Sequence, residues 1–217
     1  MARSVVGLTR DVLAELSDAA RSCAFWELDP VSRGRRPDVE ACRQAKEGWV
    51  SSTLLEWGCC GQVAYLDDRP AGYLLYAPAS FVPSADGFAT APVAADAVLL
   101  TTGQVFDEFR GSGVGRVLVQ AVVKDLARRR VKAIEAFASR TRHVCRQDPR
   151  EACLLPVDFL CSVGFRTVRP HWTTPRLRLD VRSAVSWRAD VSDAVDRLLG
   201  TLRPAGGAAV RGQSARV

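Results

Sequence analysis

The feature that most constrains the fold of this chain is a glycine-rich segment at residues 110–116, which reads Arg-Gly-Ser-Gly-Val-Gly-Arg. An apolar run precedes it and an amphipathic run follows it. The pattern predicts a strand at 97–106, a turn at 110–115, a helix at 114–130 and a strand at 132–138. Because a helical crossover joins neighbouring parallel strands, the sequence predicts a parallel βαβ unit.

Shorter elements are expected around this unit. Thr9 is placed to cap a helix, and Asp67 to Pro70 has the composition of a turn between two strands. The other expected elements are strands at 4–8, 61–66, 71–77, 165–169 and 172–179, and helices after Thr9, at 38–57 and from Pro156 to Gly164. The expected fold class is α/β (α+β), with a mixed, mostly antiparallel central sheet, the parallel βαβ unit and flanking helices.

The length and apolar content set the domain organisation. With 217 residues and 47% apolar residues, the chain is long enough for one core and short for two. We expect one domain at 1–180, followed at 181–217 by an amphipathic helix, which offers a contact for a homodimer, and a disordered tail. The aromatic-rich segment 23–30 fits either a pocket wall or the core, and the proline-containing segment 78–95 fits either the border of a site or a surface loop.

Composition narrows the classes of function. The net charge of +6 at pH 7 suits an anionic ligand as well as nucleic acid, but no helix-turn-helix, zinc-finger or aromatic-platform signature favours nucleic acid. The seven cysteines lack zinc-ligand spacing, and their odd number without a signal peptide is typical of a reducing cytoplasm. No stretch approaches the roughly 20 apolar residues of a membrane-spanning helix. We therefore expect a soluble, cytoplasmic protein with no metal and no membrane partner.

The glycine-rich turn has the properties of a phosphate-binding loop. It opens a helix, where main-chain N–H groups lack intrahelical partners and the helix dipole is positive. Glycines at 111, 113 and 115 allow the main chain to approach phosphate oxygens closely. A Walker loop is excluded because no lysine is suitably placed, and a dinucleotide fingerprint is excluded because Arg116 stands where a glycine is required.

The remaining pattern, R/Q-x-x-G-x-G/A, is satisfied by Arg110, Gly113 and Gly115. With the preceding strand, the run from Val105 to Gly115 resembles the acetyl-CoA motif of the GNAT superfamily of N-acetyltransferases. About 45 residues later, Phe159-Leu-Cys-Ser-Val-Gly-Phe165 is similar to a second segment of that family. Two linked motifs make a generic strand-to-helix turn the minority interpretation.

The resemblance implies acetyl-CoA as the acetyl donor and a direct attack by an acceptor amine of a small molecule or a protein. Val105 would supply main-chain contacts to the pantetheine arm, and a main-chain N–H near it would polarise the thioester carbonyl. The residues implied for the pyrophosphate are Arg110, Gly111, Ser112, Gly113, Val114, Gly115 and Arg116.

The general base is a separate question, because the attacking amine must lose a proton. Glu135 interrupts an otherwise apolar strand, and its carboxylate is expected either to act as the base or to pair with an arginine. Asp96, at the start of the preceding strand, is the second candidate, and a purely structural role where the loop meets the strand is its alternative. Glu27, Tyr76 and His171 could line the acceptor side, but packing or exposure explains each of them as well.

The family's frequent tyrosine acid falls at Leu160, which has no proton to donate. This departure motivates an alternative function, a catalytically lapsed GNAT-fold protein that binds CoA or a protein partner. A nucleic-acid-binding module, based on the arginine excess, is a third and weaker hypothesis.

Overall fold

The computed structural model describes residues 3–35, 37–140 and 153–184. By its contacts the chain divides into two units, 1–185 and 186–217. The second unit lies outside the described residues, and so does most of the predicted helix and tail at 181–217. All of the described residues therefore belong to the first unit.

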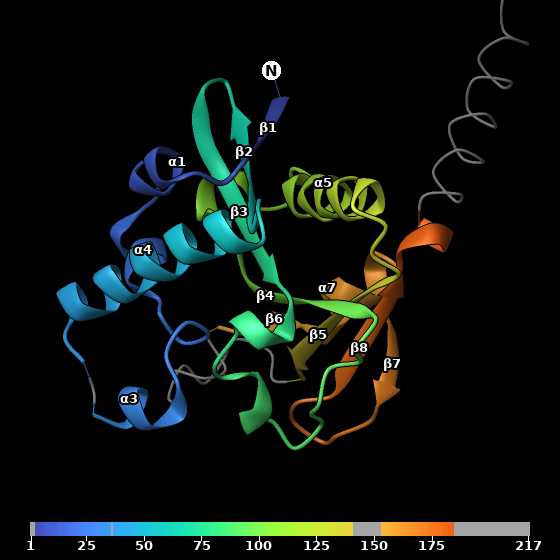
Figure 1. Cartoon of the computed structure of the whole chain (residues 1–217). Helices are drawn as coiled ribbons and strands as arrows, with labels where there is room; N and C mark the ends of the chain where they lie inside the picture. Colours follow the sequence, from blue (N-terminus) through green and yellow to red (C-terminus); the bar gives the residue numbers. More distant parts are fainter. Residues whose placement is uncertain (1–2, 36, 141–152, 185–217) are drawn as a thin grey trace, which may run out of the picture. The chain divides into compact units, whose positions relative to one another are not determined.

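A single mixed sheet forms the centre of this unit (Figure 1). Its strand order is β1-β2-β3-β4-β5-β8-β7, and β6 pairs with β5 off this path. Pairing is antiparallel except between β4 and β5 and between β5 and β6. The strands are β1 (Arg3–Gly7), β2 (Gly61–Leu66), β3 (Arg69–Ala77), β4 (Ala97–Val105), β5 (Ala133–Ser139), β6 (Leu155–Pro156), β7 (Arg166–Arg169) and β8 (Arg176–Asp180). The expected mostly antiparallel sheet with one parallel βαβ unit, β4-α5-β5, is confirmed.

Six α-helices lie wholly within the described ranges: α1 (Arg10–Ala14), α2 (Asp18–Ser22), α3 (Pro30–Gly34), α4 (Val39–Glu56), α5 (Val114–Arg128) and α7 (Val157–Ser162). The predicted helix after Thr9 is two short helices rather than one. Thr9 does cap α1, because its side chain accepts a hydrogen bond from the main-chain N–H of Val12. Ser17 then caps α2 in the same way, and a second capping residue begins a new helix.

The β2–β3 hairpin forms as expected around residues 67 and 68. Leu66 pairs with Arg69, which leaves Asp67 and Asp68 as the two-residue turn. Their φ angles are 48° and 62°, the left-handed conformation that a tight hairpin turn requires. Aspartate tolerates this conformation better than most residues, so the turn fixes the register of the hairpin.

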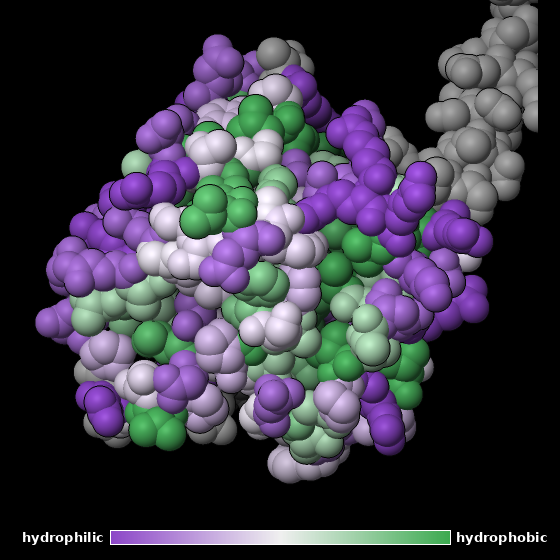
Figure 2. Space-filling model, in the orientation of Figure 1, coloured by the Kyte–Doolittle hydropathy of each residue, from purple (hydrophilic) through white to green (hydrophobic). Residues whose placement is uncertain are grey.

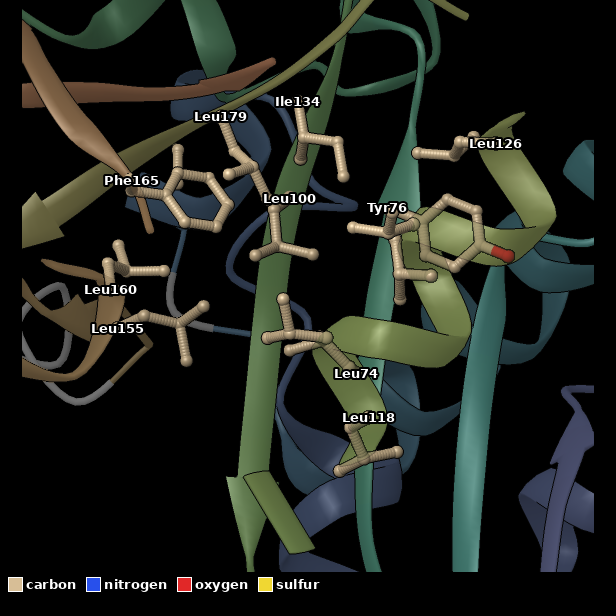
Figure 3. Packing of buried hydrophobic residues seen from close by; sticks show 14 of the residues in the cluster. Leu74, Tyr76, Leu100, Leu118, Leu126, Ile134, Leu155, Leu160, Phe165 and Leu179 are labelled. Carbon is tan, nitrogen blue, oxygen red and sulfur yellow. The ribbon is translucent and has the colours of Figure 1, made fainter. Parts of the chain in front are cut away.

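Helix α5 packs against one face of the sheet. Its buried residues Leu118, Val122 and Leu126 lie in one cluster with Leu100 and Ile134 of β4 and β5. Figure 3 shows this packing from close by, with Leu100 among its labelled neighbours. Figure 2 shows hydrophilic residues over the exposed side of α5, so the helix separates a buried apolar stripe from a polar surface.

The opposite face of the sheet carries α1, α2 and α4, and beside them a cluster of aromatic rings. Trp26 is 1% exposed and stacks on Phe88, which in turn stacks on Phe137 of β5 with ring centroids 4.3 Å apart. Segment 23–30 was expected to form either a pocket wall or part of the core. The structure places its aromatic residues in the core.

No helix in the described ranges combines the length and apolar character needed to cross a membrane.

Gly72 provides a test of the contact between β3 and β4. It pairs with Val105, and a Cβ atom at Gly72 would lie 2.6 Å from the main-chain oxygen of Gln104. We expect Gly72→Ala to lower the free energy of unfolding by about 1–3 kcal/mol, because the two strands must separate to admit the methyl group. Gly48→Ala in α4 is the matched control, since its Cβ would meet nothing within 4 Å and alanine favours a helix. Urea unfolding should show opposite signs for the two variants, and equal effects would contradict the tight contact.

Candidate functional site

The main structural feature of the candidate site is a separation of β4 from β5. The two strands pair only from Ala97 to Leu99, opposite Ala133 to Glu135. From Leu100 to Val105, β4 is paired with β3 alone within the described part of the chain. The end of β5 pairs instead with β6, at Leu155 and Pro156. Main-chain groups on one side of the second half of β4 are therefore left for a ligand that lies along the strand.

A β-bulge lies in the same half of β4. Leu100 is opposite Tyr76 but Gly103 is opposite Leu74, so Thr101 and Thr102 share a single residue of the partner strand. The hydroxyl of Thr101 donates to the carbonyl of Leu75 at 3.2 Å. The hydroxyl oxygen of Thr102 is buried, and it has no hydrogen-bond partner among the described residues. A buried hydroxyl without a partner beside an unpaired strand edge fits a site that a polar ligand completes.

The glycine-rich turn follows β4 and continues into the first residues of α5, which begins at Val114. Gly113 is the N-cap of α5, with φ at 83°, and it supplies no side-chain hydrogen bond to the helix. The first N–H groups of the helix are therefore not capped by a side chain at this position. Ser112 faces the preceding turn, because both its N–H and its hydroxyl donate to the carbonyl of Phe109.

The three glycines have two different roles. A Cβ atom at Gly111 or Gly113 would meet nothing within 4 Å, so the space above the turn is open at both positions. A Cβ atom at Gly115 would lie 2.9 Å from the ring of Phe159 in α7. Gly111 and Gly113 thus leave room for an anion, whereas Gly115 lets α7 pack closely against α5.

Two arginines flank this turn, and both are partly or fully exposed. Arg110 forms an ion pair with Asp107 at 2.7 Å, and Arg116 donates to the carbonyl of Ser162 at 3.3 Å. Because such exposed contacts are weak, both guanidinium groups can turn toward a phosphate. The predicted cofactor residues from Val105 to Arg116 therefore lie together at the end of the half of β4 that is separated from β5, and they fit a diphosphate-bearing ligand.

Glu135 lies at the other end of this region, buried in β5 with 2% exposure. Its carboxylate lies 3.3 Å from Nε of Arg176 and accepts hydrogen bonds from Arg178 at 3.2 Å and from the main-chain N–H of Ala94 at 3.1 Å. These contacts match the paired-carboxylate alternative for Glu135. The arginines come from β8, the antiparallel neighbour of β5.

Asp96 joins the same network. Arg178 donates two hydrogen bonds to its carboxylate, each 3.0 Å long, and this contact lowers the pKa of Asp96 below its usual value. The structure therefore brings Asp96 and Glu135 together through one arginine. Glu135 is level with Leu99, six residues before Val105, which corresponds to about 20 Å along a strand. The two candidate bases are thus remote from the glycine-rich turn.

The other residues considered for the acceptor side have structural contacts. Glu27 pairs with Lys46, and the hydroxyl of Tyr76 donates to Asp125 of α5 at 2.8 Å. His171 accepts main-chain hydrogen bonds within its own turn. Leu160 is fully buried in the cluster beneath α5.

Two polar pairs could not be anticipated from the sequence. Nζ of Lys46 lies 2.6 Å from Oε1 of Glu27, and both side chains are 0% exposed. The sulfur atoms of Cys23 and Cys153 lie 3.0 Å apart, although 130 residues separate them in the chain. No short-range pattern marks either pair, because the partners come from different elements. Among the described residues, no three His, Cys, Asp or Glu side chains gather in a way that could hold a metal ion.

The chain is similar to known proteins in structure, but searches by sequence found no match. No protein-family model matches the chain, and no curated protein matches it. A GNAT-family protein from Desulfovibrio desulfuricans superposes with a TM-score of 0.50 at 20% identity, over 83% of this chain and 99% of its own. YncA from Salmonella typhimurium, solved with acetyl-CoA, gives 0.51 at 16% identity, over 83% and 95% of the two chains. The aminoglycoside acetyltransferase AAC(6')-Ib, solved with coenzyme A, gives 0.53 at 17% identity, over 85% and 98%.

Proposed function

We propose that this chain, which has the GNAT fold, is an N-acetyltransferase that takes its acetyl group from acetyl-CoA and passes it to an amine of a small molecule or a protein. The observation that carries the proposal is the half of β4 that has separated from β5 and leads into an open, glycine-rich helix N-terminus. Two of the structurally similar acetyltransferases were solved with coenzyme A or acetyl-CoA.

Each part of the site has a role in this proposal. Main-chain N–H groups from Gly111 to Arg116, apart from that of Ser112, which donates to Phe109, would hold the diphosphate, and Arg110 and Arg116 would add positive charge. Val105 would contact the pantetheine arm through its main chain. Acetyl-CoA supplies an activated thioester when it is bound. The acceptor amine must be neutral to attack, so a base must take its proton. Glu135 and Asp96 stay the candidate bases. Both need a direct test, because each carboxylate already accepts a hydrogen bond from Arg178.

Binding of acetyl-CoA is the first test. At a concentration a hundredfold above the dissociation constant, acetyl-CoA should stabilise the protein by about 2.7 kcal/mol, or roughly 5–10 °C in the unfolding temperature. Gly113→Trp should abolish this shift, because the indole would occupy the open space above the turn. Thermal unfolding with and without acetyl-CoA measures both quantities.

Gly113→Ala is the matched control for backbone strain, because both substitutions place a side chain on a residue with φ at 83°. Both variants should lose similar stability without ligand, but alanine should keep part of the acetyl-CoA shift. No shift of the wild-type protein at millimolar acetyl-CoA would overturn the proposal.

A second function, a GNAT-fold protein that binds CoA without turnover, is favoured by one observation. Leu160 cannot protonate a leaving thiolate. A panel of amines assayed for release of free CoA separates the two functions. Turnover with any amine supports the transferase, whereas a thermal shift without turnover across the panel favours the lapsed protein.

A further inference from the structure

Cys23 and Cys153 form a close pair of thiols between two distant segments. Cys23 is the C-cap residue of α2, and Cys153 lies two residues before β6. Their sulfur atoms lie 3.0 Å apart, and a hydrogen bond joins them. Both cysteines are free thiols, and both residues are partly exposed. Neither of the two cysteine residues is fully buried within the described structure.

The surrounding structure holds the two segments together without help from the sulfur atoms. The indole N–H of Trp26 donates to the carbonyl of Cys153 at 3.1 Å. Trp26 is itself fixed by stacking on Phe88 and Phe137, and both cysteines pack against the same aromatic cluster. The short separation of the sulfur atoms is thus imposed by the core.

The two thiols differ in acidity. The pKa of Cys23 is lowered to about 7, first because Cys153 hydrogen-bonds to it and further because Lys46 is positively charged, against the opposing effect of burial. The pKa of Cys153 is raised, because its hydrogen bond with Cys23 and its burial both favour the neutral thiol. The lowered pKa of Cys23 and the raised pKa of Cys153 favour Cys23 as the attacking thiol and Cys153 as the thiol that resolves the adduct.

We propose that Cys23 and Cys153 are a modification site, a dithiol that low-molecular-weight disulfides such as oxidised glutathione convert into an intramolecular disulfide. This inference is independent of the proposed acetyl transfer. The other described cysteines do not form such a pair: Cys42 lies in α4, Cys161 is exposed at α7, and Cys59 and Cys60 are adjacent in the chain.

The reaction takes place in two exchanges. The thiolate of Cys23 attacks one sulfur of oxidised glutathione, the disulfide bond of the reagent breaks, and one glutathione thiolate leaves. Cys153 then gives up its proton, and its sulfur attacks the Cys23 sulfur and expels the second glutathione. The protein loses two electrons and two protons, and one oxidised glutathione takes them up and becomes two reduced molecules.

The full-length chain, reduced and then freed of reductant, is treated with oxidised glutathione, quenched with acid and an alkylating agent, and analysed by peptide mass spectrometry. We expect a peptide pair linked through Cys23 and Cys153, with the mass of two hydrogen atoms lost. Cys153→Ser should instead accumulate a glutathione adduct at Cys23, because no second thiol resolves it. In that variant Cys23 should react roughly tenfold faster than Cys42, whose pKa is raised by burial.

Cys161 is the internal control, because it is exposed and its reaction shows that the reagent was active. Cys161→Ser should keep the Cys23–Cys153 link, and thermal unfolding confirms that each variant is folded. Glutathione on Cys161 with no link between Cys23 and Cys153 in the wild-type protein would overturn the proposal. A stable glutathione adduct at Cys23 in the wild-type protein would also overturn it.

Discussion

Replacing Lys46 with methionine is expected to lower the free energy of unfolding by about 3–5 kcal/mol, because the carboxylate of Glu27 would stay buried without its partner. The two groups lie 2.6 Å apart, and both side chains are 0% exposed. Methionine is flexible and apolar and fills much of the volume of the lysine stem, so the lost charge dominates the effect. Urea unfolding of the wild type and the variant at neutral pH measures it.

Two further variants test whether the loss of stability is specific to the buried ion pair. Glu47→Gln removes a neighbouring ion pair on α4, in which Arg21 lies 3.2 Å from Glu47 with both side chains partly exposed, and it should cost at most about 1 kcal/mol. The double variant Glu27→Leu with Lys46→Met should regain most of the lost stability, because no buried charge remains. A loss of less than about 1 kcal/mol for Lys46→Met alone would contradict the buried pair.

This ion pair also connects the stability of the core to the proposed dithiol. Lys46 of α4 pairs with Glu27, and the positive charge of Lys46 lowers the pKa of Cys23 while the negative charge of Glu27 raises it. Glu27 follows Trp26, whose indole holds Cys153 in place. The segment from Cys23 to Glu27 therefore contributes to the aromatic cluster, contacts α4 through Glu27 and carries the thiol of Cys23.

Local patterns in the sequence were enough to predict the parts of the fold that depend on neighbouring residues. The turn at Asp67 and Asp68 follows from residues that tolerate positive φ, and the glycine-rich turn follows from its place between an apolar strand and an amphipathic helix. Asp38, the N-cap of α4, likewise stands at the start of the predicted helix. Each of these features is decided within a few residues.

Other parts depend on contacts that no local pattern records. The predicted strand at 172–179 begins only at Arg176, because His171 accepts hydrogen bonds from the main-chain N–H groups of Thr173 and Thr174 and holds them in a turn. Strand β6 exists through its pairing with the end of β5 and is too short to show a period.

The candidate site also contains residues that a local motif predicts and contacts that only the folded structure shows. The residues proposed for the diphosphate come from one continuous segment, so a single sequence motif predicts them together. The role of Glu135 depends on Arg176 and Arg178, more than 40 residues further along the chain. The sequence could show that a buried carboxylate needs a partner or a function, but only the register of β5 with β8 places both arginines beside it.

The variant Glu135→Gln distinguishes a structural role of Glu135, as the partner of Arg176 and Arg178, from a catalytic role as the general base. The structural role predicts a loss of about 3–5 kcal/mol in the free energy of unfolding, because the side chain of Arg176 is only 9% exposed and its charge would lose its partner. Glutamine keeps the shape of the side chain and can still accept from the main-chain N–H of Ala94, so the change isolates the charge. Urea unfolding measures the loss, and the acetyl-CoA thermal shift should persist, because the glycine-rich turn is remote from Glu135.

Asp96→Asn is the matched control, because it removes the other carboxylate bound to Arg178 at a position that is 40% exposed. It should change the stability little, since solvent screens the pair and Glu135 still neutralises the arginine. The catalytic role predicts the reverse for Glu135→Gln, with wild-type unfolding and loss of turnover once an acceptor amine is known. Wild-type stability of this variant would therefore show that Arg176 and Arg178 do not need the carboxylate, and Glu135 would then be the leading candidate for the base.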